Sequence, residues 1–270
     1  MKRLLHFLAI LALGAMLVGC ETVQTTQSGT VGVTRQQSML VSAEEVNQAA
    51  TQEYSKIVSQ ASQAGKLNRN PQEVQRVRGV ATRLIGQTGA FRSDAPSWKW
   101  QTNVISDPQV NAWCMPGGKI AVYTGLMEKL QLTDDELAAI MGHEMAHALR
   151  EHGREQVSRQ MATGLALNVA SAALGLGDAA SQLASIVADV TFNLPHSRTD
   201  ETEADRIGVE LAARAGYNPH AAVSVWQKMV KVSSNGPPQF LSTHPSPENR
   251  LHDLEIYAQR VMPLYQSARR

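Results

Sequence analysis

Two histidines and a glutamate lie within the segment His143-Glu144-Met145-Ala146-His147. This is the H-E-x-x-H pattern. On a helix its first and fifth positions share one face, so both imidazoles can bind one metal ion, with zinc as the metal expected. Glu144, one residue along, then reaches a water molecule beside the ion and can act as a general base. The alternative is a solvated helix face with two ordinary histidines, because the polar residues Arg150, Glu151 and His152 follow closely.

A third ligand must come from elsewhere, since a catalytic zinc site usually has three protein ligands and one open position. The strongest downstream candidates lie in Glu201-Thr202-Glu203-Ala204-Asp205, because zinc accepts carboxylate oxygen beside imidazole. Glu201 and Asp205 share a helical face, so one can bind the metal while the other accepts the free N–H of a ligand histidine. Spacing alone excludes neither Glu203 as the ligand nor a solvated acidic face.

Two predicted helices carry these residues. Thr133-Asp134-Asp135-Glu136 matches a capping box, and the helix that it opens is expected to reach about His152, with Gly153 as its stop. The acidic run lies in a second predicted helix over residues 198 to 215, which Gly216 ends. The metal site therefore requires two helices from distant parts of the chain to converge.

Further helices and a small sheet are predicted before the H-E-x-x-H segment. Ser42-Ala43-Glu44-Glu45 is another capping box, whose helix ends near Gly65, and a second helix begins at Asn70-Pro71. From Trp98 to Tyr123 apolar and polar residues alternate, which predicts strands, with Pro116-Gly117-Gly118 as the turn before the last one. We expect an α+β fold, mainly helical, with a small antiparallel sheet.

Small and apolar side chains dominate residues 157 to 192, but Gly175, Gly177 and Asp178 interrupt this run. The run falls short of the apolar length that spans a bilayer, so a buried or lid-like helical pair is expected. A polar, proline-rich loop over residues 233 to 247 leads to a terminal amphipathic helix.

The N-terminus has the features of an export signal. Lys2-Arg3 precedes an apolar run from Leu4 to Val18, which ends in Leu17-Val18-Gly19-Cys20. This ending resembles a bacterial lipobox, which implies that residues 1 to 19 are a lipoprotein signal peptide and that Cys20 is lipidated. The alternative is an uncleaved anchor helix with an incidental cysteine.

The predicted domain organisation follows from composition. Residues 20 to 40 are expected to be the lipidated Cys20 and a flexible tether, because residues 21 to 38 are rich in Thr, Gln, Ser and Gly without an apolar period. Residues 41 to 270 are expected to form a single domain. With 25 basic and 24 acidic residues and no basic run, nucleic acid is a poor partner for this chain.

These features together resemble the gluzincin peptidases, which include the CAAX prenyl proteases, the HtpX heat-shock proteases and, nearest in kind, bacterial periplasmic lipoprotein proteases of the LoiP type. The resemblance covers about residues 70 to 255. It depends on His143 to His147, Glu201-x-x-Ala204-Asp205, Asn111-Ala112, Pro116-Gly117-Gly118, Thr124-Gly125-Leu126, Thr243-His244-Pro245 and Arg250. It implies a zincin-like fold over residues 41 to 270, with one Zn²⁺ per chain held by His143, His147 and Glu201.

The resemblance also implies roles for residues around the metal. Asp205 would support a ligand histidine or donate a proton. His244 would stabilise an oxyanion or occupy the open zinc position at rest; a loop histidine bonded to backbone is the alternative. Arg250 would support negative charge or pair with a surface acid. The strand Ile120-Ala121-Val122-Tyr123 would bind substrate by strand addition, unless it is an ordinary sheet strand.

The expected function is that of a zinc-dependent endopeptidase with Glu144 as the general base. By resemblance to sorted lipoproteins it would be anchored by lipid at the outer membrane, facing the periplasm, and would cleave misfolded or unassembled envelope polypeptides. Envelope assembly factors or chaperones are possible partners. Two alternatives are a lipoprotein chaperone or assembly factor with a catalytically silent site, and a binding lipoprotein without metal.

Overall fold

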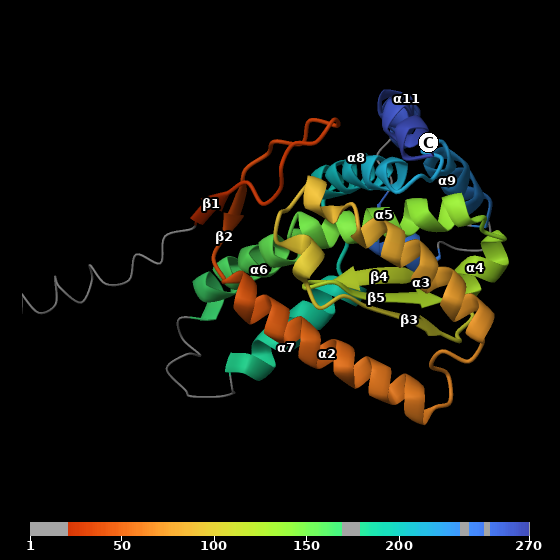
Figure 1. Cartoon of the computed structure of the whole chain (residues 1–270). Helices are drawn as coiled ribbons and strands as arrows, with labels where there is room; N and C mark the ends of the chain where they lie inside the picture. Colours follow the sequence, from red (N-terminus) through yellow and green to blue (C-terminus); the bar gives the residue numbers. More distant parts are fainter. Residues whose placement is uncertain (1–20, 169–178, 233–237, 246–248, 270) are drawn as a thin grey trace, which may run out of the picture.

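The computed structural model describes residues 21–168, 179–232, 238–245 and 249–269 (Figure 1). The predicted signal peptide and Cys20 lie outside these residues. The strands are β1 (Glu21–Val23), β2 (Gln37–Met39), β3 (Gln101–Ile105), β4 (Ala112–Met115) and β5 (Lys119–Tyr123). The helices are α2 (Ala43–Gln63), α3 (Pro71–Ile85), α4 (Thr124–Leu130), α5 (Asp134–Leu149), α6 (His152–Asn168), α7 (Ala179–Phe192), α8 (Arg198–Arg214), α9 (Ala221–Val232), α10 (Gln239–Thr243) and α11 (Arg250–Ala268). The predicted mainly helical α+β fold is confirmed.

The helix starts follow from capping residues that the sequence displays. Ser42 and Thr133 each form the predicted capping box, at the N-termini of α2 and α5 respectively. Asn70 caps α3, which begins at Pro71 as predicted. Ser197 forms a further capping box at the start of α8. Each cap satisfies backbone N–H groups that have no partner within the helix.

The three-stranded sheet has the order β3-β5-β4, with β4 antiparallel and β3 parallel to β5. The prediction of an antiparallel sheet is therefore wrong for β3. The β4–β5 hairpin turns through Pro116-Gly117-Gly118, as predicted, with positive φ at both glycines. Because β4 occupies one edge of β5, β3 pairs at the other edge. There it runs parallel to β5. Apolar alternation gives strand faces but not strand direction, so the sequence did not reveal this.

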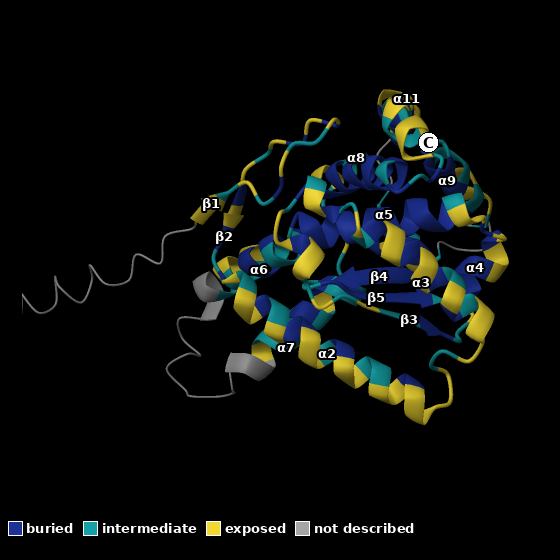
Figure 2. Cartoon of the chain, viewed as in Figure 1, coloured by how far each residue is buried: buried dark blue, intermediate teal, exposed yellow. Residues whose placement is uncertain are grey.

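Helix α5 lies between the sheet and α8, and nearly all of it is buried (Figures 1 and 2). The two helices meet at two glycines. A Cβ on Gly142 would lie 2.8 Å from the carbonyl oxygen of Gly208, and a Cβ on Gly208 would lie 2.7 Å from the backbone nitrogen of His143. The helix backbones therefore touch directly, beside the first histidine of the H-E-x-x-H segment.

Helix α5 ends earlier than predicted. Its last residue is Leu149, Glu151 adopts φ +54°, and α6 begins at His152, so the predicted stop at Gly153 is wrong. The left-handed residue turns the chain by itself, without glycine. Arg150 and His152 are fully buried, which contradicts the alternative of a solvated face.

Helices α6 and α7 form the predicted pair within the described residues, and α7 packs on α2. Val157, Val187 and Val190 join Tyr54 and Trp113 in a second apolar core. Nowhere in the described part of the chain is a helix both long enough and apolar enough to cross a bilayer.

Residues 24–41, here called the N-terminal strap, pack against the folded body. Val31, Val33, Met39 and Gln37 are buried, and β2 pairs with β1. The prediction of a flexible tether is wrong for this segment, because alternate side chains face the protein and bury apolar surface despite the polar composition.

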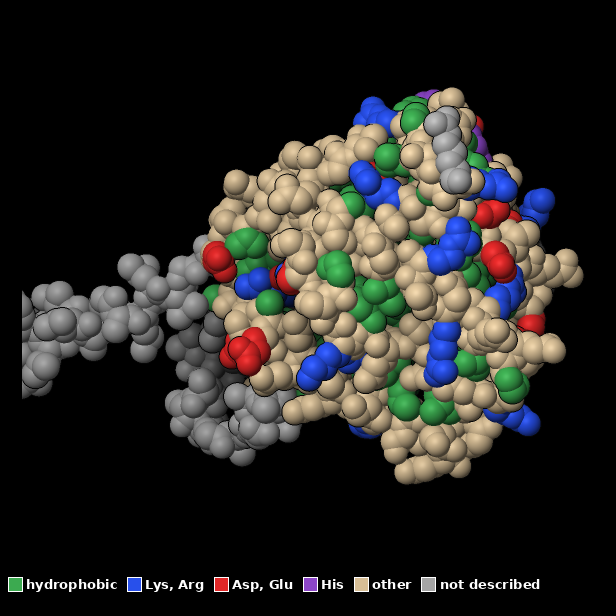
Figure 3. All heavy atoms as spheres, in the orientation of Figure 1, with side chains coloured by type: hydrophobic (Ala, Val, Ile, Leu, Met, Phe, Trp, Pro, Cys, Tyr) green, Lys and Arg blue, Asp and Glu red, His purple; other side chains and the backbone are tan. Residues whose placement is uncertain are grey.

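On the face seen in Figure 3, acidic side chains lie among basic ones, in keeping with the balanced charge of the sequence.

Candidate metal centre

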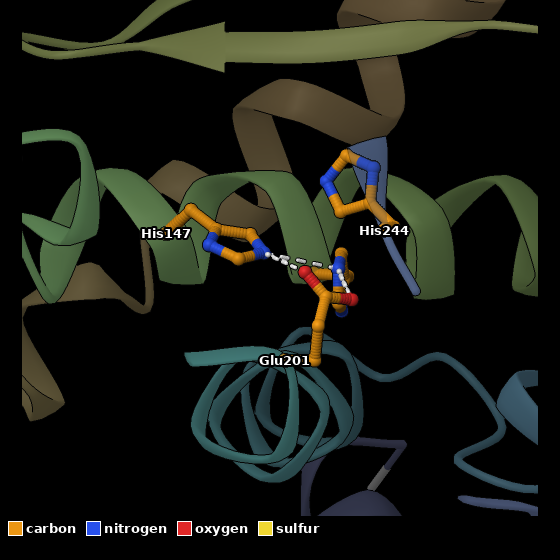
Figure 4. A group of neighbouring side chains, drawn as sticks. His147, Glu201 and His244 are labelled. Carbon is orange, nitrogen blue, oxygen red and sulfur yellow. Dashed lines mark hydrogen bonds and ion pairs between the residues drawn. The ribbon is translucent and has the colours of Figure 1, made fainter. Parts of the chain in front are cut away.

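The structure brings together the residues that the sequence selected as metal ligands. His143 and His147 come from α5, Glu201 from α8 and His244 from the segment after α10; Figure 4 shows three of them gathered at one point. One nitrogen or oxygen from each of the four lies within 4.8 Å of the others, and all four residues are buried. Nε2 of His143 is 3.5 Å from one oxygen of Glu201, and Nε2 of His147 is 3.4 Å from the other.

The donor set fits a zinc ion. Both carboxylate oxygens of Glu201 and Nε2 of His244 are buried without a hydrogen bond among the described residues. Arg250 makes an ion-pair contact with Oε2 of Glu201, so the oxygen that a further cation would chiefly satisfy is Oε1, together with Nε2 of His244. Burial opposes ionisation of Glu201, but His244, His143 and His147 more than offset it and hold its pKa well below the usual value. Two imidazoles and a carboxylate are a set that catalytic zinc accepts.

Asp205 faces the first ligand histidine rather than the metal position. Its Oδ1 is 2.9 Å from Nδ1 of His143, which turns Nε2 toward Glu201. Burial opposes the charged imidazole, yet Asp205 and Glu201 outweigh it and raise the pKa of His143 to about 9. The structure thus distinguishes the two acids that spacing left open: Glu201 lies at the metal position and Asp205 supports its histidine.

Arg250 holds both acids. Its Nη2 is 2.7 Å from Oδ1 of Asp205 and 3.1 Å from Oε2 of Glu201, and its guanidinium lies 3.3 Å from the ring centre of Trp226. Arg250 is buried, so the acids that it pairs with are site residues and not the surface acid considered in the sequence. These two ion pairs hold Glu201 and Asp205 in place on α8.

Glu144 points away from α8, toward β4. Its Oε1 is 3.3 Å from Nε2 of His244, and its side chain lines a cavity beside the metal position. Burial raises the pKa of Glu144 to about 8, with the charge of Glu201 adding to the rise and His143 opposing it. A carboxylate with a pKa near neutrality can both take and release a proton, as a general base requires.

His244 approaches the site in a defined tautomer. Its Nδ1 lies 3.0 Å from the carbonyl oxygen of Phe240. Because a carbonyl only accepts, Nδ1 carries the hydrogen and Nε2 presents a lone pair to the metal position. Burial holds the pKa of His244 well below its usual value, which favours the neutral ring. This geometry fits a metal ligand better than a hydrogen-bond donor to an oxyanion.

The cavity beside Glu144 runs along β4, an edge strand. Its lining includes Asn111 to Cys114, together with His147, His196 and His244. The N–H of Tyr123 donates to the carbonyl of Asn111. Since hydrogen-bonded and non-hydrogen-bonded pairs alternate in an antiparallel ladder, the backbone groups of Ala112 and Cys114 face away from β5.

The strand predicted to bind substrate is the wrong one. Ile120, Ala121 and Val122 belong to β5, which is paired with β3 on one side and β4 on the other. A strand needs an unpaired edge to accept another chain, so β5 is an ordinary central strand.

Two histidines near the site escaped the sequence prediction. The ring of His196 stacks on that of His147 at 4.1 Å, and its Nδ1 is buried without a partner among the described residues. His152 contacts His147 through Nδ1 at 2.9 Å. Its position five residues after His147 was the only signal in the sequence, and on a continuous helix that spacing places two side chains on different faces.

The chain is similar in sequence to known metallopeptidases. Over 181 residues the chain is 35% identical to the mitochondrial metalloendopeptidase OMA1 of Schizosaccharomyces pombe, covering 66% of this chain and 51% of that protein. It is 33% identical over 171 residues to a putative beta-barrel assembly-enhancing protease of Vibrio cholerae, covering 60% and 35%. The beta-barrel assembly-enhancing protease of Yersinia pestis is 25% identical over 206 residues, covering 72% and 40%.

The chain thus spans about half or less of the length of these relatives. The matching region contains every residue of the metal centre. Residues 71–258 match Peptidase family M48, and the chain belongs to this family of peptidases.

Proposed function

We propose that this protein is a zinc metalloendopeptidase of the bacterial cell envelope that cleaves misfolded or unassembled polypeptides. The observation that carries the proposal is the buried group of His143, His147, Glu201 and His244 around one point, with Glu144 beside it. Membership of family M48 supports the peptidase activity.

His143, His147 and Glu201 would hold the ion, one per chain. Zinc bound in this way supplies Lewis acidity, which polarises a carbonyl and makes water more acidic. Glu144 takes the proton of the attacking water and delivers it to the leaving amine, which completes hydrolysis of the amide bond. Asp205 and Arg250 keep Glu201 and His143 in place while this happens.

The substrate would bind as an extended strand along β4. The outward backbone groups of Ala112 and the outward carbonyl of Cys114 would pair with it at the border of the cavity that contains Glu144, whereas the N–H of Cys114 already donates to Glu144. Backbone pairing tolerates varied sequences, which suits an enzyme that cleaves unfolded chains. His244 would occupy the open metal position at rest and leave when substrate arrives.

The proposed location is the outer membrane, facing the periplasm, with the lipid on Cys20. The support is the lipobox-like Leu17-Val18-Gly19-Cys20 and the names of the Vibrio and Yersinia relatives, which refer to assembly of β-barrels. Envelope assembly factors are proposed partners for the same reason. Cys20→Ala should abolish incorporation of labelled palmitate and release the protein from washed membranes. Unchanged labelling would contradict the anchor.

The variant Glu144→Gln tests the catalytic proposal. Digestion of casein should fall at least about a thousandfold, because the general base is lost, while zinc content stays near one per chain because Glu144 is not a ligand. His143→Ala, the matched variant, should lose both zinc and activity. Treatment with a chelator should abolish activity of the unaltered protein, and added zinc should restore it.

A chaperone or assembly factor with a silent site remains the competing function. Zinc retention with undiminished proteolysis in Glu144→Gln would refute the role of Glu144. Stoichiometric zinc, no hydrolysis by the unaltered protein and normal cellular function of Glu144→Gln would favour the chaperone.

A further inference from the structure

The two ligand histidines are supported in different ways. Nδ1 of His143 faces the carboxylate of Asp205 directly. Nδ1 of His147 instead faces another imidazole, that of His152, at 2.9 Å. A histidine that binds metal through Nε2 needs its Nδ1–H held by an acceptor, since this fixes the tautomer and the ring orientation. His152 is the residue that supplies the acceptor to His147.

The hydrogen positions in this pair follow from the next contact. Nε2 of His152 lies 3.0 Å from Oε2 of Glu203. An ionised carboxylate only accepts, so Nε2 of His152 carries the hydrogen and its Nδ1 presents a lone pair. His147 must then donate from Nδ1, which leaves Nε2 of His147 free for the metal. The hydrogen bonds therefore run in one direction: His147 donates to His152, and His152 donates to Glu203.

Glu203 is held as a carboxylate by two arginines. Arg150 contacts its Oε2 through Nε at 3.0 Å and Nη2 at 2.9 Å, and Arg35 contacts its Oε1 through Nε at 2.8 Å. Burial opposes ionisation of Glu203, but His152 and Arg35 outweigh it and lower its pKa to about 2. The acid that spacing left open as a zinc ligand is therefore engaged in the support of His147.

Arg35 belongs to the N-terminal strap. It also contacts Glu155 through Nη1 at 2.8 Å and Asp200 through Nη2 at 3.0 Å, while its side chain remains 29% exposed. All three carboxylates that it joins are almost completely buried. Arg150 also pairs with Glu203 and Arg159 with Asp200, but Arg35 is the cation that contacts all three acids, and its removal would leave buried charge less compensated beside the metal site.

The strap is fixed to the same place by further bonds. Nη2 of Arg150 donates to the carbonyl of Arg35, Thr25 donates to the carbonyl of Arg150, and Gln37 donates to Glu155. The positive φ of Glu151 ends α5 just before His152 and turns this ring back toward His147. Polar contacts thus link the N-terminal strap to the end of α5, to His152 and through it to the proposed metal ligand His147.

We propose that His152 is a positioning residue for His147 and that the N-terminal strap, through Arg35 and Glu203, is part of the metal site. The proposal rests on the metal binding advanced above. The strap precedes residue 71, where the match to family M48 begins. This support for His147 therefore draws on a part of the chain outside that match.

The test measures metal binding on the full chain. Zinc affinity is determined by competition with a chromophoric chelator, and the Co²⁺-substituted protein gives an absorption spectrum that reports ligand geometry. His152→Phe should bind zinc about 10-fold to 100-fold more weakly, the range for loss of a group that orients a metal ligand. His152→Gln should recover most of the affinity, because its amide can both accept from His147 and donate to Glu203.

Arg35→Ala tests the strap, with Glu210→Gln as the matched control. Glu210 is a buried acid that accepts from the backbone N–H of Val31 in the strap and pairs with Arg214, but makes none of the contacts to His152 or Glu203. Arg35→Ala should weaken zinc binding and alter the Co²⁺ spectrum. Glu210→Gln should change thermal stability while leaving both metal readouts unchanged.

Each failure has its own signature. If the unaltered protein binds no zinc, the proposed function fails. If the unaltered protein and His152→Phe bind zinc equally and give the same Co²⁺ spectrum, only the positioning role is overturned. Zinc affinity and a Co²⁺ spectrum of Arg35→Ala equal to those of the unaltered protein would remove the strap from the metal site.

Discussion

The two sides of the metal centre are built differently. On one side α5 and α8 touch backbone to backbone at Gly142 and Gly208, and almost every residue of both helices near the site is buried. On the other side no strand of the described residues pairs with the outer edge of β4, and His244 approaches from a short segment after α10. The side that supplies the ligands leaves no room for a methyl group at the helix contact, whereas the facing side presents outward backbone groups of β4 to the cavity. Fixed ligands beside an open strand edge suit the proposed endopeptidase, whose substrate would bind through its backbone.

The largest effect is expected from a single methyl group on the packed side. Gly208→Ala should destabilise the protein by about 1–3 kcal/mol and cause loss of zinc on dialysis, because a Cβ would meet the backbone of His143 and push α8, with Glu201, away from α5. Gly79→Ala in α3 is the control, since nothing lies within 4 Å of its added Cβ. Thermal melting and zinc analysis measure both. Full zinc content and an unchanged melting temperature in Gly208→Ala would show that the contact does not position Glu201.

A smaller effect is expected where the two sides meet, at His244. If its Nε2 occupies the metal position in about nine-tenths of the molecules, His244→Ala should raise the initial rate of peptide cleavage about tenfold. His220→Ala is the control, because that histidine contacts Glu255 and has no contact with the metal centre. A fall in kcat for His244→Ala would instead support the role of His244 in stabilising an oxyanion.

The smallest effect is expected on the open edge. Ala112→Pro should raise KM about threefold to tenfold, since it removes one N–H, worth about 1 kcal/mol, that faces the cavity. Ala121→Pro, in the central strand, should instead destabilise the fold, because every N–H of β5 faces a neighbouring strand. Peptide kinetics and melting curves separate the two. Unchanged KM in folded Ala112→Pro would argue against strand addition at β4.

Local sequence patterns predicted most of the helical framework. Caps at Ser42, Asn70 and Thr133 depend on a few adjacent residues, so the sequence displays them directly. The meeting of His143, His147 and Glu201 was predicted from the chemistry of zinc ligands together with the family resemblance. Both kinds of information come from short motifs, in which the residues that matter lie a few positions apart in the sequence.

Features that depend on tertiary contact were not predicted. The order β3-β5-β4 places β5 at the centre, and no spacing in the sequence encodes that order. His152 looked like part of a solvated face because the left-handed conformation of Glu151 was not foreseen. In the strap, alternation of Val31 and Val33 was present but was outweighed by the polar composition around it. Charged and polar side chains such as Arg35 become informative only when their buried partners are known.

The packing of the strap has a consequence for reach. A free chain of about twenty residues would let an anchored enzyme sample a shell of roughly 20–30 Å from the bilayer. Here the described fold begins at Glu21 with β1, one residue after the proposed lipid attachment point, and the following residues are bound to the body. If Cys20 carries lipid, only a very short segment separates the folded body from the bilayer, so the body would lie at the membrane surface. It would then meet polypeptides held at that surface rather than those free in the periplasm.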